Sequence, residues 1–196
     1  FGRAREIARD ARLPIQFARA VLGARGDVRS GTGSQSYDPT RVSELEEALV
    51  GLPEAESELR ARLLSALALE LYWSNDFERV NPLTAEGLGL ARSSGDPGLL
   101  METLLSAVPA SWRPDNLARR LPLCQEACAR AMEHGDSTAR MVAFQYRALA
   151  RLESTDAVGA ESDRAAAESL ESTRNAQVLR HYSGNVRVIR LLSRGE

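Results

Sequence analysis

A turn signal that recurs at intervals of roughly twenty residues constrains the fold of this chain more than any other feature. The signal is a residue pair ending in aspartate, and it occurs at Asn75-Asp76, Gly95-Asp96, Pro114-Asp115, Gly135-Asp136 and Thr155-Asp156. Amphipathic helical sequence fills the intervals, and two intervals make a unit of about forty residues, the size of the helix hairpins in α-solenoids. The spacing therefore predicts an all-α protein, a right-handed α-solenoid of about four to five antiparallel helix hairpins similar to tetratricopeptide repeats.

The composition supports a helical protein. The hydrophobic fraction is 43% and the aromatic fraction is 5%, and the apolar residues are mostly leucine and alanine. Both residues favour helix, and the β-branched residues typical of strands are few. We expect a single helical-repeat domain over residues 1–196, cut from a longer chain because helical sequence reaches almost to Phe1 and Glu196.

Proline, aspartate and glycine indicate where the helices begin and end. In chain order, we expect helices over about 1–10, 14–22, 39–52, 57–72, 77–94, 97–107, 114–134, 137–153, 157–172 and 175–192. A longer turn is expected from Val108 to Arg113, and Pro122 is expected to kink its helix. Residues 24–38 are rich in Gly, Ser and Asp without an apolar period, which predicts a mobile loop.

The charge pattern argues against nucleic acid as a direct partner. All 25 basic residues are arginine, the net charge is -2, and the arginines are spread along the helices without forming a basic stripe. A general coding bias explains the choice of arginine without any functional argument. No stretch is long and apolar enough to span a bilayer, and no signal peptide opens the chain, so we expect a cytoplasmic protein that does not contact membranes.

The residues capable of metal binding or catalysis do not form a recognisable site. Cys124 and Cys128 lie one helical turn apart, but a disulfide needs a closer approach of the two side chains. His134 does not share the helix face of the two cysteines, so the three residues do not form a metal site. We interpret the two cysteines as core thiols of a reduced, intracellular protein. His181 is a lone histidine without a neighbouring nucleophile or acid. The sequence therefore predicts no enzyme activity, no metal and no cofactor.

Two tryptophans are candidate binding residues. Trp73 and Trp112 both lie beside expected turns, at the ends of hairpins. The favoured interpretation is packing of the hairpin end, and the alternative is an exposed aromatic lip that anchors a peptide or small ligand.

A second set of candidates lies on the later helices. These residues would line the concave side of the solenoid and could grip a carboxylate or an acidic segment, although a solvated helix face is the simpler interpretation. They are Tyr146, Arg147, Arg151, Arg180, Tyr182 and Arg187.

Several segments together resemble a known family. Gly-Asp between helices, with Ala and Leu at packing positions, resembles the tetratricopeptide repeat. The more particular segments are Leu45-Glu46-Glu47-Ala48-Leu49, Leu59-Arg60-Ala61-Arg62-Leu63-Leu64, Glu70-Leu71-Tyr72-Trp73-Ser74 with Asp76, Ala85-Glu86-Gly87-Leu88-Gly89-Leu90-Ala91-Arg92, Gly95-Asp96-Pro97, and Trp112 with Pro114-Asp115. Over most of the chain, they resemble the helical-repeat region of large ATP-binding LuxR-type transcriptional regulators.

The resemblance implies a role in signal transduction. In that family the repeats lie between a nucleotide-binding domain and a DNA-binding domain, and they act as a sensor, a scaffold or an autoinhibitory surface. This chain contains no G-x-x-x-x-G-K-[ST] sequence and no recognisable helix-turn-helix, so neither ATP binding nor DNA binding can be assigned to residues of this sequence. The expected partner is a protein or a flanking domain of the same chain. A stand-alone scaffold for a partner peptide and a small-metabolite sensor are the alternatives.

Overall fold

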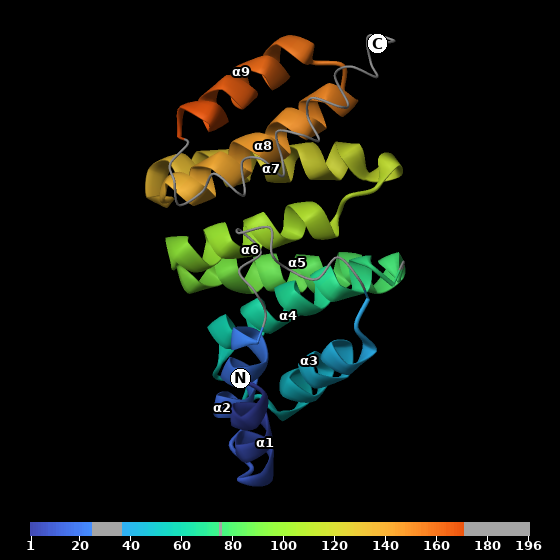
Figure 1. Cartoon of the computed structure of the whole chain (residues 1–196), viewed down its shortest axis with the longest axis vertical. Helices are drawn as coiled ribbons and strands as arrows, with labels where there is room; N and C mark the ends of the chain where they lie inside the picture. The colour runs from blue at the N-terminus through green and yellow to red at the C-terminus, as the bar shows by residue number, and fades with distance from the viewer. Residues whose placement is uncertain (25–36, 75, 171–196) are drawn as a thin grey trace. The chain divides into compact units, whose positions relative to one another are not determined.

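The computed structural model describes residues 1–24, 37–74 and 76–170 (Figure 1). Every regular element in these ranges is a helix, which confirms the all-α prediction for this part of the chain. The helix expected at 175–192 and nearly all of the loop expected at 24–38 lie outside the described residues. Contacts group the chain into two compact units that meet in the sequence between Ser111 and Trp112. We call them the N-terminal and the C-terminal unit.

The N-terminal unit is a succession of helices in which each packs against the next. They are α1 (Gly2–Asp10), α2 (Pro14–Gly23), α3 (Pro39–Gly51), α4 (Ser57–Tyr72), α5 (Phe77–Ser94) and α6 (Pro97–Ala110). Helix α4 is the centre of the unit, because it contacts α2, α3, α5 and α6. Its leucines are buried on most sides, which is typical of a helix packed between neighbours.

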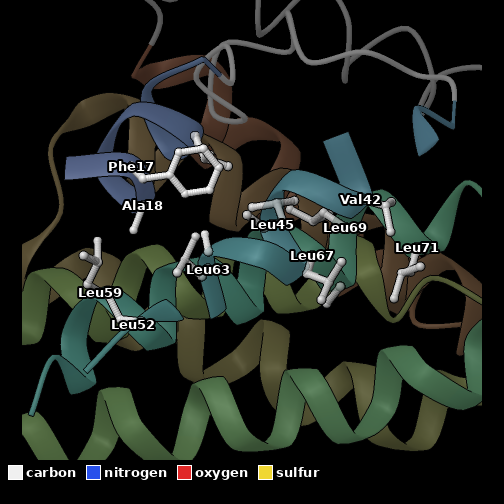
Figure 2. Packing of buried hydrophobic residues seen from close by; sticks show 14 of the residues in the cluster. Phe17, Ala18, Val42, Leu45, Leu52, Leu59, Leu63, Leu67, Leu69 and Leu71 are labelled. Carbon is white, nitrogen blue, oxygen red and sulfur yellow. The ribbon is translucent and has the colours of Figure 1, made fainter. Parts of the chain in front are cut away.

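One hydrophobic core joins the first helices of this unit (Figure 2). Phe17 of α2, Val42 and Leu45 of α3 and Leu63 and Leu67 of α4 are all buried in it. The spacing of three between Val42 and Leu45 places both side chains on one face of α3. Burial of these leucines stabilises the unit by about 2 kcal/mol for each side chain.

The C-terminal unit begins with a single 3-10 turn, η2 (Pro114–Asn116), and continues with α7 (Leu117–His134), α8 (Ser137–Glu153) and α9 (Ala157–Ser169). Helix α8 packs against both α7 and α9. Pro122 lies inside α7, as expected, in the first part of the helix.

The recurring aspartates act as helix N-caps. The carboxylates of Asp96, Asp136 and Asp156 accept hydrogen bonds at 2.8 Å from backbone N–H groups in the first turns of α6, α8 and α9. Asp38 caps α3 in the same way. Each such cap stabilises its helix by about 1 kcal/mol. Asp76 also precedes a helix, α5, but its side chain makes no cap hydrogen bond.

A serine two residues before the aspartate completes three of these turns. The hydroxyls of Ser74, Ser94 and Ser154 donate to the carbonyl oxygen three residues earlier, at 2.8 to 2.9 Å. Ser74 and Ser94 also accept the N–H of the following Asp76 and Asp96, at 3.3 and 3.1 Å. The Ser-x-Asp sequence therefore closes one helix and opens the next.

The turn expected from Val108 to Arg113 is wrong at its beginning. Helix α6 continues to Ala110, although Pro109 lies inside its last turn. Val108 and Ala110 are both buried in the N-terminal unit, so packing outweighs the backbone cost of the proline. The hydroxyl of Ser111 then donates to the carbonyl of Ala107 at 2.7 Å and closes the helix.

Candidate functional site

Trp73 belongs to an aromatic cluster where α4 meets α5. The cluster consists of Tyr72, Trp73 and Phe77: the Tyr72 ring meets the Trp73 ring edge-on at 5.1 Å between centroids and the Phe77 ring at 5.9 Å. Trp73 nevertheless remains 42% exposed. The contact with Tyr72 therefore covers only part of Trp73, and the rest of the residue is exposed to solvent.

Polar contacts hold the segment between α4 and α5 at the end of α4 and at the start of α5. Ser74 binds the end of α4 through the Leu71 carbonyl. On α5, Arg79 forms an ion pair with Glu46 of α3 and approaches Asp76 at 3.6 Å. The hydrogen bond that Arg79 donates to Glu46 raises the pKa of Arg79 above its usual value, so this cation persists throughout the physiological range. The exposed indole thus sits on a turn held by neighbouring helices.

Trp112, in the C-terminal unit, packs against a buried arginine. The guanidinium carbon of Arg120 lies 4.3 Å from the Trp112 ring centroid, and the Tyr146 ring lies 6.1 Å away. Arg120 is 0% exposed; it donates to the Arg113 carbonyl at 2.9 Å and forms an ion pair with Glu153. Trp112 thus packs against these side chains while it remains partly exposed, and its predicted binding role stays a prediction. Tyr146 is itself buried, so its side chain presents no groove surface.

Arg147 and Arg151 do grip a carboxylate, and it belongs to this chain. Arg147 of α8 forms two hydrogen bonds with Asp163 of α9, at 2.9 and 2.6 Å. Arg151 adds one to Asp163 at 2.9 Å and another to the Gly159 carbonyl at 2.9 Å. The Asp163 side chain is 3% exposed, and its hydrogen bonds raise the pKa of Arg147. These arginines join α8 to α9, and neither lies on a fully solvated face.

The two cysteines are buried free thiols, as predicted. Burial raises the pKa of both Cys124 and Cys128 to about 12. A thiol that stays protonated is a poor nucleophile and a poor metal ligand. Within the described ranges, no group of three His, Cys, Asp or Glu side chains is placed to hold a metal ion.

The remaining candidates of the predicted groove lie outside the described residues. They are Arg180, Tyr182 and Arg187, together with His181. Their predicted binding role stays a prediction, as it does for Trp73.

Two charged residues of the C-terminal unit were missed by sequence reasoning. Arg120 precedes the buried Cys124 by four residues, which places it on the apolar face of α7. Asp163 lies three residues after Ala160 and four before Ala167, which are the other buried residues of α9. A charged residue in register with an apolar face was therefore the available signal in both helices.

Comparison with known proteins leaves the family open. No protein-family model matches the sequence, no curated protein matches it, and no solved structure resembles it significantly. Among the helices that the structure describes, none combines the length and apolar character required to cross a lipid bilayer.

Proposed function

We propose that this chain is a protein-recognition module made of helix hairpins, and that the aromatic cluster at the α4–α5 turn is its main anchor. The observation that carries the proposal is the exposure of Trp73, at 42%, on a turn held by hydrogen bonds and an ion pair. Large aromatic side chains of this kind contribute a disproportionate share of binding energy in protein interfaces.

The local geometry favours a binding role over an accidental exposure. Edge-on contact with Tyr72 fixes the plane of the Trp73 ring, so little side-chain entropy is lost when a partner covers it. The neighbouring Arg79–Glu46 pair supplies a polar border. An aromatic centre with a polar rim is the arrangement typical of interface hot spots.

The wider assignment rests on the repeated turn and on the resemblance. The Ser-x-Asp turns and the pairwise packing of consecutive helices support a solenoid of tetratricopeptide-like hairpins. In a cytoplasmic LuxR-type regulator, partner binding at such a module would alter its docking on the ATPase domain and thereby change transcription. The alternative is a stand-alone scaffold that uses the same aromatic anchor.

Selection from a random peptide library tests the recognition proposal. The wild-type chain should enrich peptides whose capture is lost in the Trp73→Ala variant. Val158→Ala is the matched control, because it truncates an apolar side chain that is 83% exposed in the other unit. Peptides that bind Trp73→Ala as well as wild type, or an absence of enrichment, would contradict the proposal.

The regulator assignment has a separate test. The full coding region around this sequence should hold a phosphate-binding loop upstream and a DNA-binding helix-turn-helix downstream. Flanks that contain only further helical repeats would remove the ATPase switch and leave the scaffold alternative. The peptide selection remains valid in either case.

A further inference from the structure

A second surface of the N-terminal unit forms a pocket between α1, the turn that follows it, α2 and α3. Its volume is about 310 Å³, and its walls include Arg9, Arg12, Leu13, Phe17 and Glu47. This volume lies at the lower end of the range of small-molecule sites, so it suits a small ligand. The pocket does not involve the aromatic cluster.

Arginines from α1 face glutamates from α3 beside this pocket. Arg5 forms an ion pair with Glu44, and Arg9 binds Glu47 through two hydrogen bonds at 2.9 and 2.8 Å. The spacings match, because four residues separate the arginines and three separate the glutamates, which is one helical turn in each case. We call these two successive ion pairs, Arg5–Glu44 and Arg9–Glu47, the ladder between α1 and α3.

Arg12 continues the arginine row without a carboxylate opposite. It follows Arg9 by three residues, but the corresponding stretch of α3 ends with Val50 and Gly51, neither of which is acidic. The Arg12 guanidinium makes no ion pair with any residue in the described part of the chain. Gly51 lines the pocket at this point and has no side chain, and a Cβ built on it would lie 3.8 Å from the Pro14 Cβ.

The backbone holds Arg12 in an unusual conformation at the mouth of the pocket. Its φ of 54° lies in the left-handed region, which costs a residue with a side chain about 1 kcal/mol relative to glycine. Glycine is the residue expected for such a turn. This position therefore carries an arginine although the backbone conformation favours glycine.

The rest of the pocket is apolar. Phe17 forms part of its floor, with the Arg9 guanidinium carbon 4.8 Å from the ring centroid. Leu13 is partly exposed beside it, and Pro14 adds a rigid wall. Glu47 is paired with Arg9, so Arg12 is the charged residue of the pocket lining that has no carboxylate partner in the described part of the chain.

We propose that this pocket binds a small organic carboxylate with an apolar body. The carboxylate completes the ladder by pairing with Arg12, and the apolar body covers Leu13, Pro14 and Phe17. Arginine suits this role because its planar guanidinium binds a carboxylate through two parallel hydrogen bonds. The site is independent of the proposed aromatic anchor, so either proposal can fail without the other.

Titration followed by NMR of the backbone amides tests this site. The probes are phenylacetate and hexanoate, each compared with its neutral amide. The acids should shift the backbone N–H signals of residues 8–13, 15–17 and 51 in a saturable way. They should bind about tenfold more tightly than phenylacetamide and hexanamide, as expected for a charge-assisted hydrogen bond. Equal binding of acid and amide, or no saturable shift from either acid, would overturn the proposal.

Matched variants assign the effect to Arg12. Arg12→Met should weaken acid binding about tenfold and leave amide binding unchanged. Arg12→Gly should do the same while relieving the left-handed backbone, so a failure of the first variant to fold leaves the test intact. Arg3→Met removes an exposed arginine of α1 that does not line the pocket, and this variant should bind like wild type. Acid binding that survives both Arg12 substitutions would refute the assignment.

Discussion

Replacing Arg120 with methionine tests how the C-terminal unit is held together. The substitution keeps a long apolar stem but removes the hydrogen bond to the Arg113 carbonyl, the ion pair with Glu153 and the contact with the Trp112 ring. A hydrogen bond from a charged group contributes about 2 kcal/mol, and a cation–π contact about 1 kcal/mol. Methionine recovers part of the lost free energy, because its side chain packs well and because the buried Nε of Arg120, which has no hydrogen-bond partner, is removed. We expect a net loss of about 2 kcal/mol.

The partner substitution, Glu153→Ala, should cost more. Arg120 is 0% exposed and cannot be hydrated when its partner is lost, whereas the Glu153 side chain is 28% exposed and regains water when Arg120 is lost. Leaving a buried charge unpaired costs about 3–5 kcal/mol. The double variant should therefore be more stable than Glu153→Ala alone, because it removes the stranded cation.

Urea unfolding measures these differences. Fluorescence of Trp112 in a Trp73→Phe background reports on the C-terminal unit alone, because each unit contains one tryptophan. The predicted order of stability is wild type, then Arg120→Met, then Glu153→Ala. Equal stability of all three proteins, or Arg120→Met as the least stable, would refute the reasoning from burial.

Three further predictions concern the turns and the thiols. Thr155→Gly should raise the free energy of unfolding by about 1 kcal/mol, because a β-branched residue occupies a left-handed position there with φ 64°; no gain on thermal melting would contradict this. Gly135→Ala should lower it by about 2 kcal/mol, since an added Cβ would lie 2.5 Å from the Ala131 carbonyl oxygen; an unchanged melting curve would be the contrary result. Cys124 and Cys128 should resist thiol reagents at about pH 8 until the chain unfolds, and rapid labelling of the native protein would disprove their burial. Their folded-state pKa of about 12 exceeds the ordinary 9.0, so the unfolded state loses protons first and stability should fall above pH 9, by at most about 1.4 kcal/mol per pH unit for each thiol.

The helices were predictable because their signals are local. Asp38, Asp96, Asp136 and Asp156 cap helices through their own side chains and need only the next few residues to do so. The end of α6 was not predictable by the same rules. Ala110, beyond Pro109, packs into the core of the N-terminal unit, and such packing is a property of the assembled fold.

For the candidate residues on α8, the sequence indicated a possible carboxylate ligand but not which carboxylate they bind. For Arg147 and Arg151 the sequence favoured a solvated helix face, with carboxylate binding as the alternative. The structure shows that both bind a carboxylate, and the sequence alone could not show that Asp163 lies opposite them. Tyr146 was grouped with them because it lies on the same helix. Neighbouring residues on a helix point about 100° apart, so one can be buried while the next reaches another helix.

The dissociation constant of a selected peptide measures how far recognition depends on Trp73. Isothermal titration with the wild-type chain and with Trp73→Ala gives the contribution of the aromatic anchor. The substitution should weaken binding by at least about thirtyfold, the effect of losing an interface hot spot of about 2 kcal/mol, while Val158→Ala stays within about twofold of wild type. A Trp73→Ala constant within about twofold of wild type would show that recognition does not depend on this cluster.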